Sequence, residues 1–107
     1  MRPIEFQILL TLATGQRHGY AIIQDIQARP DAARTVETGT LYRALQRLVE
    51  QALVRPTESP RAPTDEDERR RYYAITPAGR RAATAEARRM ASLVDQARLA
   101  QLISGDS

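Results

Sequence analysis

An amphipathic helical pattern over Thr38–Leu48, followed by a strand pattern over Arg71–Ile75, constrains the fold of this 107-residue chain most strongly. Leu41 and Leu45 recur at the spacing that buries one face of a helix, and the second segment alternates the faces of its side chains as a strand does. Thr38 offers a side-chain oxygen as the cap of the helix. The opposite face of this helix is polar, so the helix is expected to lie at the surface of a small domain beside a short sheet.

Two helices are predicted before this segment. The first covers residues 3–13, where apolar side chains recur at i, i+3, i+4 and i+7, and it ends at Gly15. A short turn over residues 16–19 leads to the second helix, which Arg29-Pro30 closes. Residues 31–37 are expected to form a loop. The expected buried faces are Phe6, Leu9, Leu10 and Ala13 in the first helix, Ile22, Ile23 and Ile26 in the second, and Leu41, Leu45, Leu48 and Ala52 in the third.

A β-hairpin and a long final helix are predicted after the third helix. Leu53-Val54-Arg55 begins one strand, residues 56–63 are rich in turn formers, and Arg71–Ile75 returns as the partner strand. Thr76 caps the last helix with Pro77 at its first position, and the Ala- and Arg-rich pattern continues to about Ile103. The predicted fold class is mainly α with a small β-hairpin. Residues 1–76 form the predicted domain, residues 77–103 a C-terminal helix and residues 104–107 a disordered tail.

The composition restricts the chemistry that the chain can carry out. It contains no Cys, which excludes disulfides and thiolate metal sites, and its single histidine, His18, is expected to be a turn residue rather than a metal ligand or a base. No arrangement of acid and nucleophile and no glycine-rich phosphate loop accompanies it, so we expect neither an enzyme nor a cofactor. No apolar run approaches the roughly 20 residues of a membrane span and no signal peptide is recognised, which predicts a cytoplasmic chain without a membrane partner.

The charge of the chain favours a polyanionic partner. The sixteen basic residues are all Arg, the formal net charge is +3 and the isoelectric point is near 9.9. Neutralising phosphates releases counterions and steers encounter, although a genome of biased composition would also enrich Arg. Acidic residues gather at Glu58 and Asp65–Glu68, in the tip of the predicted hairpin. Phosphates would repel this tip, so we expect it to point away from a polyanion such as DNA or to be mobile; alternatively, it neutralises Arg69–Arg71.

The polar face of the third helix offers side chains suited to DNA. Arg43 and Arg47 lie one turn apart, and either guanidinium could form two hydrogen bonds with a guanine edge, while Gln46 could read adenine in the same way. Thr40 and the hydroxyl of Tyr42 suit contacts to phosphate or through water. The alternatives are that Tyr42 packs at the rim beside Leu45, and that the two arginines only solvate an exposed face, with Arg47 pairing with Glu50.

The order helix, helix, helix, strand, strand, long helix resembles the PadR family of bacterial transcription regulators, in its short form with a single C-terminal helix. The resemblance covers residues 4 to about 85 and rests on Leu9-Leu10, His18-Gly19-Tyr20, Gly39–Leu48, Arg70–Tyr73 with Ile75-Thr76, and Gly79-Arg80-Arg81. It implies a winged helix-turn-helix that dimerises through the last helix and represses promoters carrying an inverted repeat. The expected partners are therefore double-stranded DNA and a second copy of the chain.

The resemblance also implies roles for individual residues. It assigns Thr40, Tyr42 and Arg43 to the major groove, and Tyr20 and Tyr72 to the phosphate backbone. Combined with the chemistry of the third helix and of the arginines before the second strand, it gives two sets of candidates. The candidate base or groove contacts are Thr40, Tyr42, Arg43, Gln46 and Arg47, and the candidate phosphate contacts are Tyr20, Thr38, Arg70, Arg71 and Tyr72.

An apolar stripe on the last helix indicates a partner surface. Its members follow a 4-3-4-3 spacing, broadened by two further residues. The predicted dimer interface consists of Ala83, Ala87, Met90, Leu93, Val94, Ala97 and Ala100. A small-molecule effector of unknown identity, contacting Met90, Leu93 and Val94, stays open as a second use of the stripe, but no aromatic residue follows Tyr73 that could stack on it.

A winged-helix module that binds another protein, and does not read DNA sequence, is the alternative function. It would have the same fold, but the polar face of its third helix would not contact DNA. DNA binding should weaken steeply with salt and depend on Arg43 or Arg47, whereas a protein-interaction module should show neither property.

Overall fold

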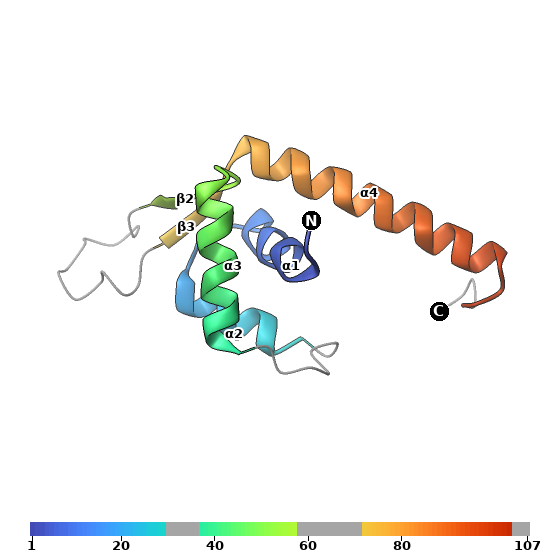
Figure 1. Cartoon of the computed structure of the whole chain (residues 1–107), viewed down its shortest axis with the longest axis horizontal. Helices are drawn as coiled ribbons and strands as arrows, with labels where there is room; N and C mark the ends of the chain where they lie inside the picture. Colours follow the sequence, from blue (N-terminus) through green and yellow to red (C-terminus); the bar gives the residue numbers. More distant parts are fainter. Residues whose placement is uncertain (30–36, 58–71, 104–107) are drawn as a thin grey trace.

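The computed structural model of the protein describes residues 1–29, 37–57 and 72–103. Figure 1 shows the helices that precede the hairpin gathered into one body, a small sheet at its edge and a long helix that leads away from it. The predicted order of the four helices and the two hairpin strands is confirmed, and one further short strand, β1, precedes α2. The elements are α1 (Pro3–Ala13), β1 (Arg17–His18), α2 (Gly19–Gln27), α3 (Thr38–Glu50), β2 (Val54–Thr57), β3 (Tyr72–Ile75) and α4 (Pro77–Leu99).

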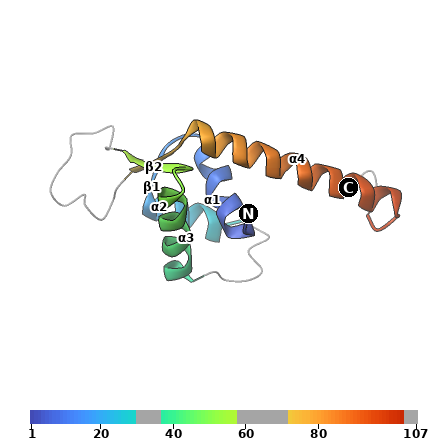
Figure 2. The same cartoon turned by 45° about the horizontal axis from the view of Figure 1, so that its top comes forward.

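The core lies between the first three helices and β2. Each helix turns one apolar face inward, and burying an aliphatic side chain of this size contributes about 1.5–3 kcal/mol. Figure 2 shows the same three helices below the first half of α4. The buried cluster consists of Ile8, Leu9, Leu12, Ile22, Ile23, Ile26, Leu41, Ala44, Leu45, Leu48 and Val54.

The buried face of α1 differs from the predicted one. Ile8, Leu9 and Leu12 are buried, whereas Leu10 is 48% exposed and Phe6 is only half-buried. The prediction was wrong because α1 contains a continuous run of apolar residues, so either of two neighbouring faces of the helix could be the buried one. Contact with α2 and α3 selects the face that contains Ile8 and Leu12.

The predicted hairpin is part of a three-stranded antiparallel sheet with the order β1-β3-β2. β2 pairs with β3 as predicted, with Val54 opposite Ile75, and β1 adds Arg17 opposite Tyr73 and His18 opposite Tyr72. Residues 16–19 were predicted as a turn. A strand of two residues shows no alternation in the sequence, and only its pairing with β3 makes it a strand.

Both ends of α3 correct the sequence prediction. Thr38 is the first helical residue instead of the cap, and Glu37 occupies the cap position, where its side chain makes no capping hydrogen bond within the described residues. At the other end Ala52 lies outside the helix, exposed, with φ of 60°. The chain leaves the helix there because the amide of Leu53 donates to the carbonyl oxygen of Leu48 over 3.0 Å.

α4 begins where it was predicted to begin and ends earlier. The Thr76 hydroxyl accepts the backbone N–H of Gly79 over 2.9 Å, with Pro77 at the first helical position. The helix stops at Leu99 instead of Ile103, because Gln101 takes a positive φ of 61° and the amide of Leu102 donates to the carbonyl oxygen of Ala97. This termination motif usually carries Gly or Asn at the left-handed position, so Gln101 gave no signal in the sequence.

The first turn of α4 is held tightly against the turn that follows α3. The amide of Thr76 donates to the carbonyl oxygen of Leu53 over 3.1 Å, and the Thr76 hydroxyl donates to that of Ala52 over 2.7 Å. A Cβ atom on Gly79 would lie 2.1 Å from the Leu53 carbonyl oxygen, so only glycine allows this approach. α3 and the start of α4 are thus joined through backbone contacts.

Candidate nucleic-acid interface

The face of α3 opposite the core is polar and open to solvent. Arg43 and Gln46 are exposed and Tyr42 is 40% exposed, while the four core residues of α3 lie on the other side. This division follows from the helical period of the leucines, which leaves every remaining position of α3 on the surface or at its margin. The polar side chains on this face are therefore not needed to pack the core and can form hydrogen bonds with a partner.

Arg43 lies along the N-terminal turn of α3. Its Nη2 donates to the Thr40 hydroxyl over 3.2 Å, and a Cβ atom on Gly39 would lie 3.5 Å from its Nη1. Long side chains on a helix lean toward its N-terminus, which brings the guanidinium over this turn. The N-terminal end of a helix also carries partial positive charge, so both features favour an anion at this end of α3. Glu37 is exposed at the same end and opposes this effect.

Arg47 has a different environment although it lies one turn further along the helix. Its Nε donates to Oε2 of Glu5 on α1 over 3.1 Å, and the other oxygen of Glu5 accepts the backbone N–H of Arg2 over 3.3 Å. The Glu5 side chain is 9% exposed and that of Arg47 is 33% exposed. Arg47 therefore ties α3 to α1, and its partner is Glu5 instead of Glu50, the partner considered in the alternative interpretation.

Tyr42 packs against the start of α2. A Cβ atom on Gly19 would lie 3.4 Å from Cε1 of Tyr42 and 3.4 Å from Cε2 of Tyr73, so both rings flank this glycine. The contact differs from packing beside Leu45, which was the alternative interpretation of Tyr42. It joins the polar face of α3 to the N-terminus of α2, on which Tyr73 of β3 also packs.

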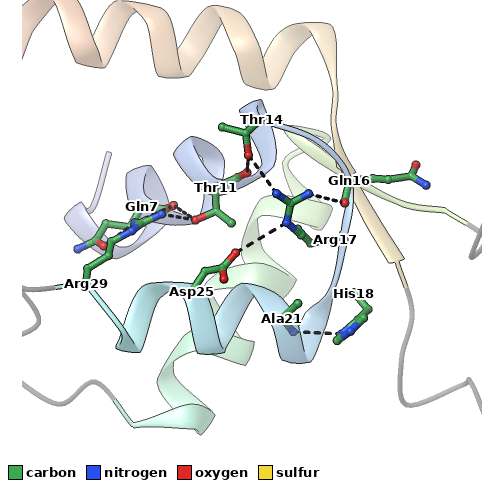
Figure 3. A network of polar contacts seen from close by, with 9 residues as sticks. All are labelled: Gln7, Thr11, Thr14, Gln16, Arg17, His18, Ala21, Asp25 and Arg29. Atoms are coloured by element: carbon green, nitrogen blue, oxygen red, sulfur yellow. Dashed lines mark hydrogen bonds and ion pairs between the residues drawn. The ribbon is translucent and has the colours of Figure 1, made fainter.

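Tyr20 and Tyr72, the two tyrosines expected near phosphates, each have a ring contact with His18. Tyr20 is 55% exposed in the first turn of α2, and Tyr72 is half-buried on β3. The His18 ring lies between them in contact with both. Its Nδ1 accepts the backbone N–H of Ala21 over 3.0 Å, which makes His18 the cap of α2 (Figure 3).

A polar network fixes α2 against α1, and Figure 3 shows its two groups of contacts. Arg17 approaches the carboxylate of Asp25 at 3.7 Å and donates to the hydroxyl of Thr14 over 3.4 Å. Arg29 donates to Oε1 of Gln7 over 2.8 Å and also to the hydroxyl of Thr11. These contacts set the direction of α2, which carries Tyr20 and packs beside Tyr42.

The predicted DNA-contacting residues fall into three groups. Thr38, Thr40 and Arg43 lie in the N-terminal part of α3 with Gln46 further along the exposed face, whereas Arg47 is held at the α1 side. Tyr20, Tyr42 and Tyr72 lie around the start of α2. Arg69–Arg71 and the acidic residues of the hairpin tip lie outside the described residues.

Two residues that support this surface were not found from the sequence. His18 was predicted only as a turn residue, and Glu5 was not singled out. His18 precedes Gly19 and could have been recognised as an N-cap, since its ring nitrogen can accept a hydrogen bond. Glu5 gave no signal, because its partner Arg47 is 42 residues away.

A shifted pKa occurs away from this surface. On α4 the hydrogen bond from Arg89 holds the pKa of Glu86 below its usual value, although burial opposes this, and the same contact raises the pKa of Arg89. The Nε atom of Arg89 lies 2.5 Å from Oε1 of Glu86. In the described ranges, no three His, Cys, Asp or Glu side chains gather closely enough to hold a metal ion.

The predicted apolar stripe on α4 separates into two parts. Ala83 is half-buried and packs against the core of its own chain. Beyond Glu86 the helix extends past α1, where Leu93 is 49% and Val94 39% exposed (Figure 1). Met90 and Ala97 are half-buried, Ala87 is exposed, and Ala100 is the exposed C-cap residue.

Among the residues that the structure describes, no helix is both long and apolar enough to cross a membrane.

Comparison with protein families and known proteins gives a match over most of the chain. Residues 8–85 match the family model described as "Transcriptional regulator PadR-like family". The chain is also 41% identical over 86 residues to an uncharacterized 37.1 kDa protein in transposon TN4556 of Streptomyces fradiae. That alignment covers 80% of the chain and 22% of the relative, so the chain spans about a fifth of that protein's length.

Several solved structures share the fold. A transcriptional regulator from Clostridium thermocellum is 26% identical, with a TM-score of 0.68 and coverage of 87% of this chain and 84% of that one. A PadR family regulator from Clostridium difficile R20291 is 21% identical, with a TM-score of 0.73 and coverage of 90% and 95%. PadR of Bacillus subtilis in complex with operator DNA is 18% identical, with a TM-score of 0.62 and coverage of 80% and 47%.

Proposed function

Because the chain belongs to the PadR-like family of transcriptional regulators, we propose that it reads a specific DNA sequence through α3. We further propose that it acts as a dimer on an inverted repeat and represses the promoter that carries it. In this proposal α3 enters the major groove, Arg43 and Gln46 approach base edges, and Thr38, Tyr20 and Tyr72 approach the backbone.

The observation that carries the proposal is the arrangement of Arg43 on the exposed face of α3. Its guanidinium is placed by Thr40 and lies on the solvent side of the helix. A positioned guanidinium loses less conformational freedom when it forms two hydrogen bonds with guanine. Arg47 is the weaker candidate for base contact, because Glu5 already accepts its Nε–H.

The overall architecture of the related B. subtilis protein gives further support. That protein has been solved with operator DNA, and its fold matches this chain with a TM-score of 0.62. The exposed apolar residues of α4 support dimerisation, since such side chains are stabilised by burial against a second copy. A symmetric dimer places two recognition helices on half-sites about 34–36 Å apart.

Binding to DNA from immediately upstream of the protein's own gene tests the proposal. Fluorescence anisotropy would compare this duplex with a scrambled duplex of the same length at two salt concentrations. Preferential binding that weakens with salt is the expected result. Equal weak binding to both duplexes would contradict sequence-specific recognition and favour the protein-interaction module.

Arg43→Ala tests the residue on which the proposal depends. We expect the variant to lose about 1–3 kcal/mol of binding free energy on the upstream duplex and much less on the scrambled one. Arg88→Ala removes the same charge from an exposed position of α4 and serves as the matched control. Equal losses for the two variants on both duplexes would indicate that only the total charge matters.

A further inference from the structure

Three aromatic rings meet where β1, β3 and the first turn of α2 come together. The rings of His18 and Tyr20 are nearly parallel, with centroids 6.5 Å apart and an interplanar angle of 12°. The rings of His18 and Tyr72 meet edge to face, with centroids 5.7 Å apart and an angle of 78°. Stacked and edge-to-face arrangements are the favourable ones for aromatic rings. His18 is the member that contacts both tyrosines.

The His18 ring is itself held from two sides. The backbone of His18 pairs with that of Tyr72 across β1 and β3, which fixes the backbone position from which the side chain extends. Its Nδ1 accepts the backbone N–H of Ala21, which fixes the orientation of the ring (Figure 3). A nitrogen that accepts a hydrogen bond carries no proton, so the proton of the neutral ring is on Nε2.

We propose that His18 is a positioning residue that holds Tyr20 and Tyr72 in one arrangement for binding to the DNA backbone. The proposal rests on the function proposed above. An exposed tyrosine that is already held in place gives up less side-chain freedom on binding than a free one. Tyr20 belongs to α2 and Tyr72 to β3. His18 therefore also holds α2 and β3 together, so that the two elements approach DNA as one unit.

Two substitutions separate the functions of the ring and of the cap. His18→Asn keeps a side-chain oxygen that can accept from Ala21, because Asn is among the preferred N-cap residues, but it removes the ring between the tyrosines. His18→Phe keeps a ring of similar shape and removes both nitrogens. Each variant is thus the control for the other.

The measurement combines thermal unfolding with anisotropy on the upstream duplex and on the scrambled one. His18→Asn loses the ring contacts but keeps the cap, so it is expected to unfold nearer the wild-type temperature than His18→Phe does, and to bind about tenfold more weakly. His18→Phe is expected to unfold about 5 °C lower because the cap is lost, and to recover most of the affinity that His18→Asn loses. A residue with only a structural role would not give opposite orders of stability and affinity.

Tyr20→Phe and Tyr72→Phe test whether His18 acts through the tyrosines. Removing either hydroxyl should weaken binding in the wild-type protein and have a smaller effect in the His18→Asn background. Equal effects in both backgrounds, or His18→Phe binding as weakly as His18→Asn, would overturn the proposal and indicate direct contact by Nε2. Wild-type protein that does not prefer the upstream duplex would overturn the proposed function as well, so the two failures are distinguishable.

Discussion

Arg43 and Arg47 lie one turn apart on α3, but their guanidinium groups have different partners. Arg43 is exposed and contacts Thr40 within the same turn, whereas Arg47 contacts the buried carboxylate of Glu5 on α1. A charge pair that is partly removed from water depends on both partners, because the one left behind is buried without compensation. Arg47 therefore contributes to the fold, and Arg43 is free to contribute to binding.

Arg47→Ala is expected to destabilise the protein more than Arg43→Ala does. The first substitution leaves the Glu5 carboxylate buried and unpaired, at a cost of about 2 kcal/mol, while the exposed Arg43 should cost less than about 0.5 kcal/mol. Urea unfolding of both variants measures the difference. Adding Glu5→Gln to Arg47→Ala should recover part of the loss, and equal stabilities of the two single variants would contradict the role of the pair.

At the scale of elements, the joint between α3, β2 and α4 depends on the absence of a side chain at Gly79. Two hydrogen bonds from Thr76 reach the carbonyl oxygens of Ala52 and Leu53, and Gly79 lies against the second of these. Backbone contacts of this kind change little when surface side chains move. The start of the long helix thus follows the orientation of α3.

Gly79→Ala and Gly39→Ala should have opposite effects on stability. Both glycines are helical, and alanine is the better helix former by about 0.5–1 kcal/mol. At Gly39 the nearest atom to a new Cβ is 3.5 Å away, so this gain should appear in part. At Gly79 the new Cβ would lie 2.1 Å from the Leu53 carbonyl oxygen and 2.8 Å from Cγ1 of Ile75, so a loss of about 1–3 kcal/mol is expected.

Thermal or urea unfolding of the two glycine variants measures this difference. Gly79→Ala that is as stable as the wild type would show that the joint opens without cost, and would contradict the close packing of α4 on Leu53.

At the scale of the whole molecule, the far half of α4 leads away from the other helices and carries exposed apolar side chains. Leu93 and Val94 are exposed there, and Figure 1 shows the helix beyond the three-helix body. Apolar side chains on one face of an extended helix are stabilised when a second copy covers them. The proposed dimer would bury the apolar side chains of this half of α4. It would also set the distance between the two copies of α3.

Leu93→Arg should produce monomers in sedimentation velocity experiments, because it places a charge in the proposed interface. Ser92→Arg introduces the same side chain at an exposed position on the opposite face of α4 and should leave the dimer intact. A dimer that persists in Leu93→Arg, or a wild-type protein that sediments as a monomer, would contradict dimerisation through this face.

The sequence by itself determined the features that depend on neighbouring residues. The leucine spacing of α3, the Thr76-Pro77 start of α4 and the pairing of β2 with β3 all follow from local periodicity, capping and turn formation. The exposed position of Arg43 also follows, because it lies opposite the leucines of the same helix. These patterns were sufficient to identify the order of the four helices and the two hairpin strands, and the polar face of α3.

Only the tertiary structure decided the features that join distant segments. The Glu5–Arg47 pair, the position of His18 between Tyr20 and Tyr72 and the pairing of β1 with β3 depend on how the helices and strands pack. The buried face of α1 was also selected by its neighbours, because its apolar run fits more than one helical face. Local patterns define the elements, whereas contacts between residues far apart in the chain decide which side chains are free to bind.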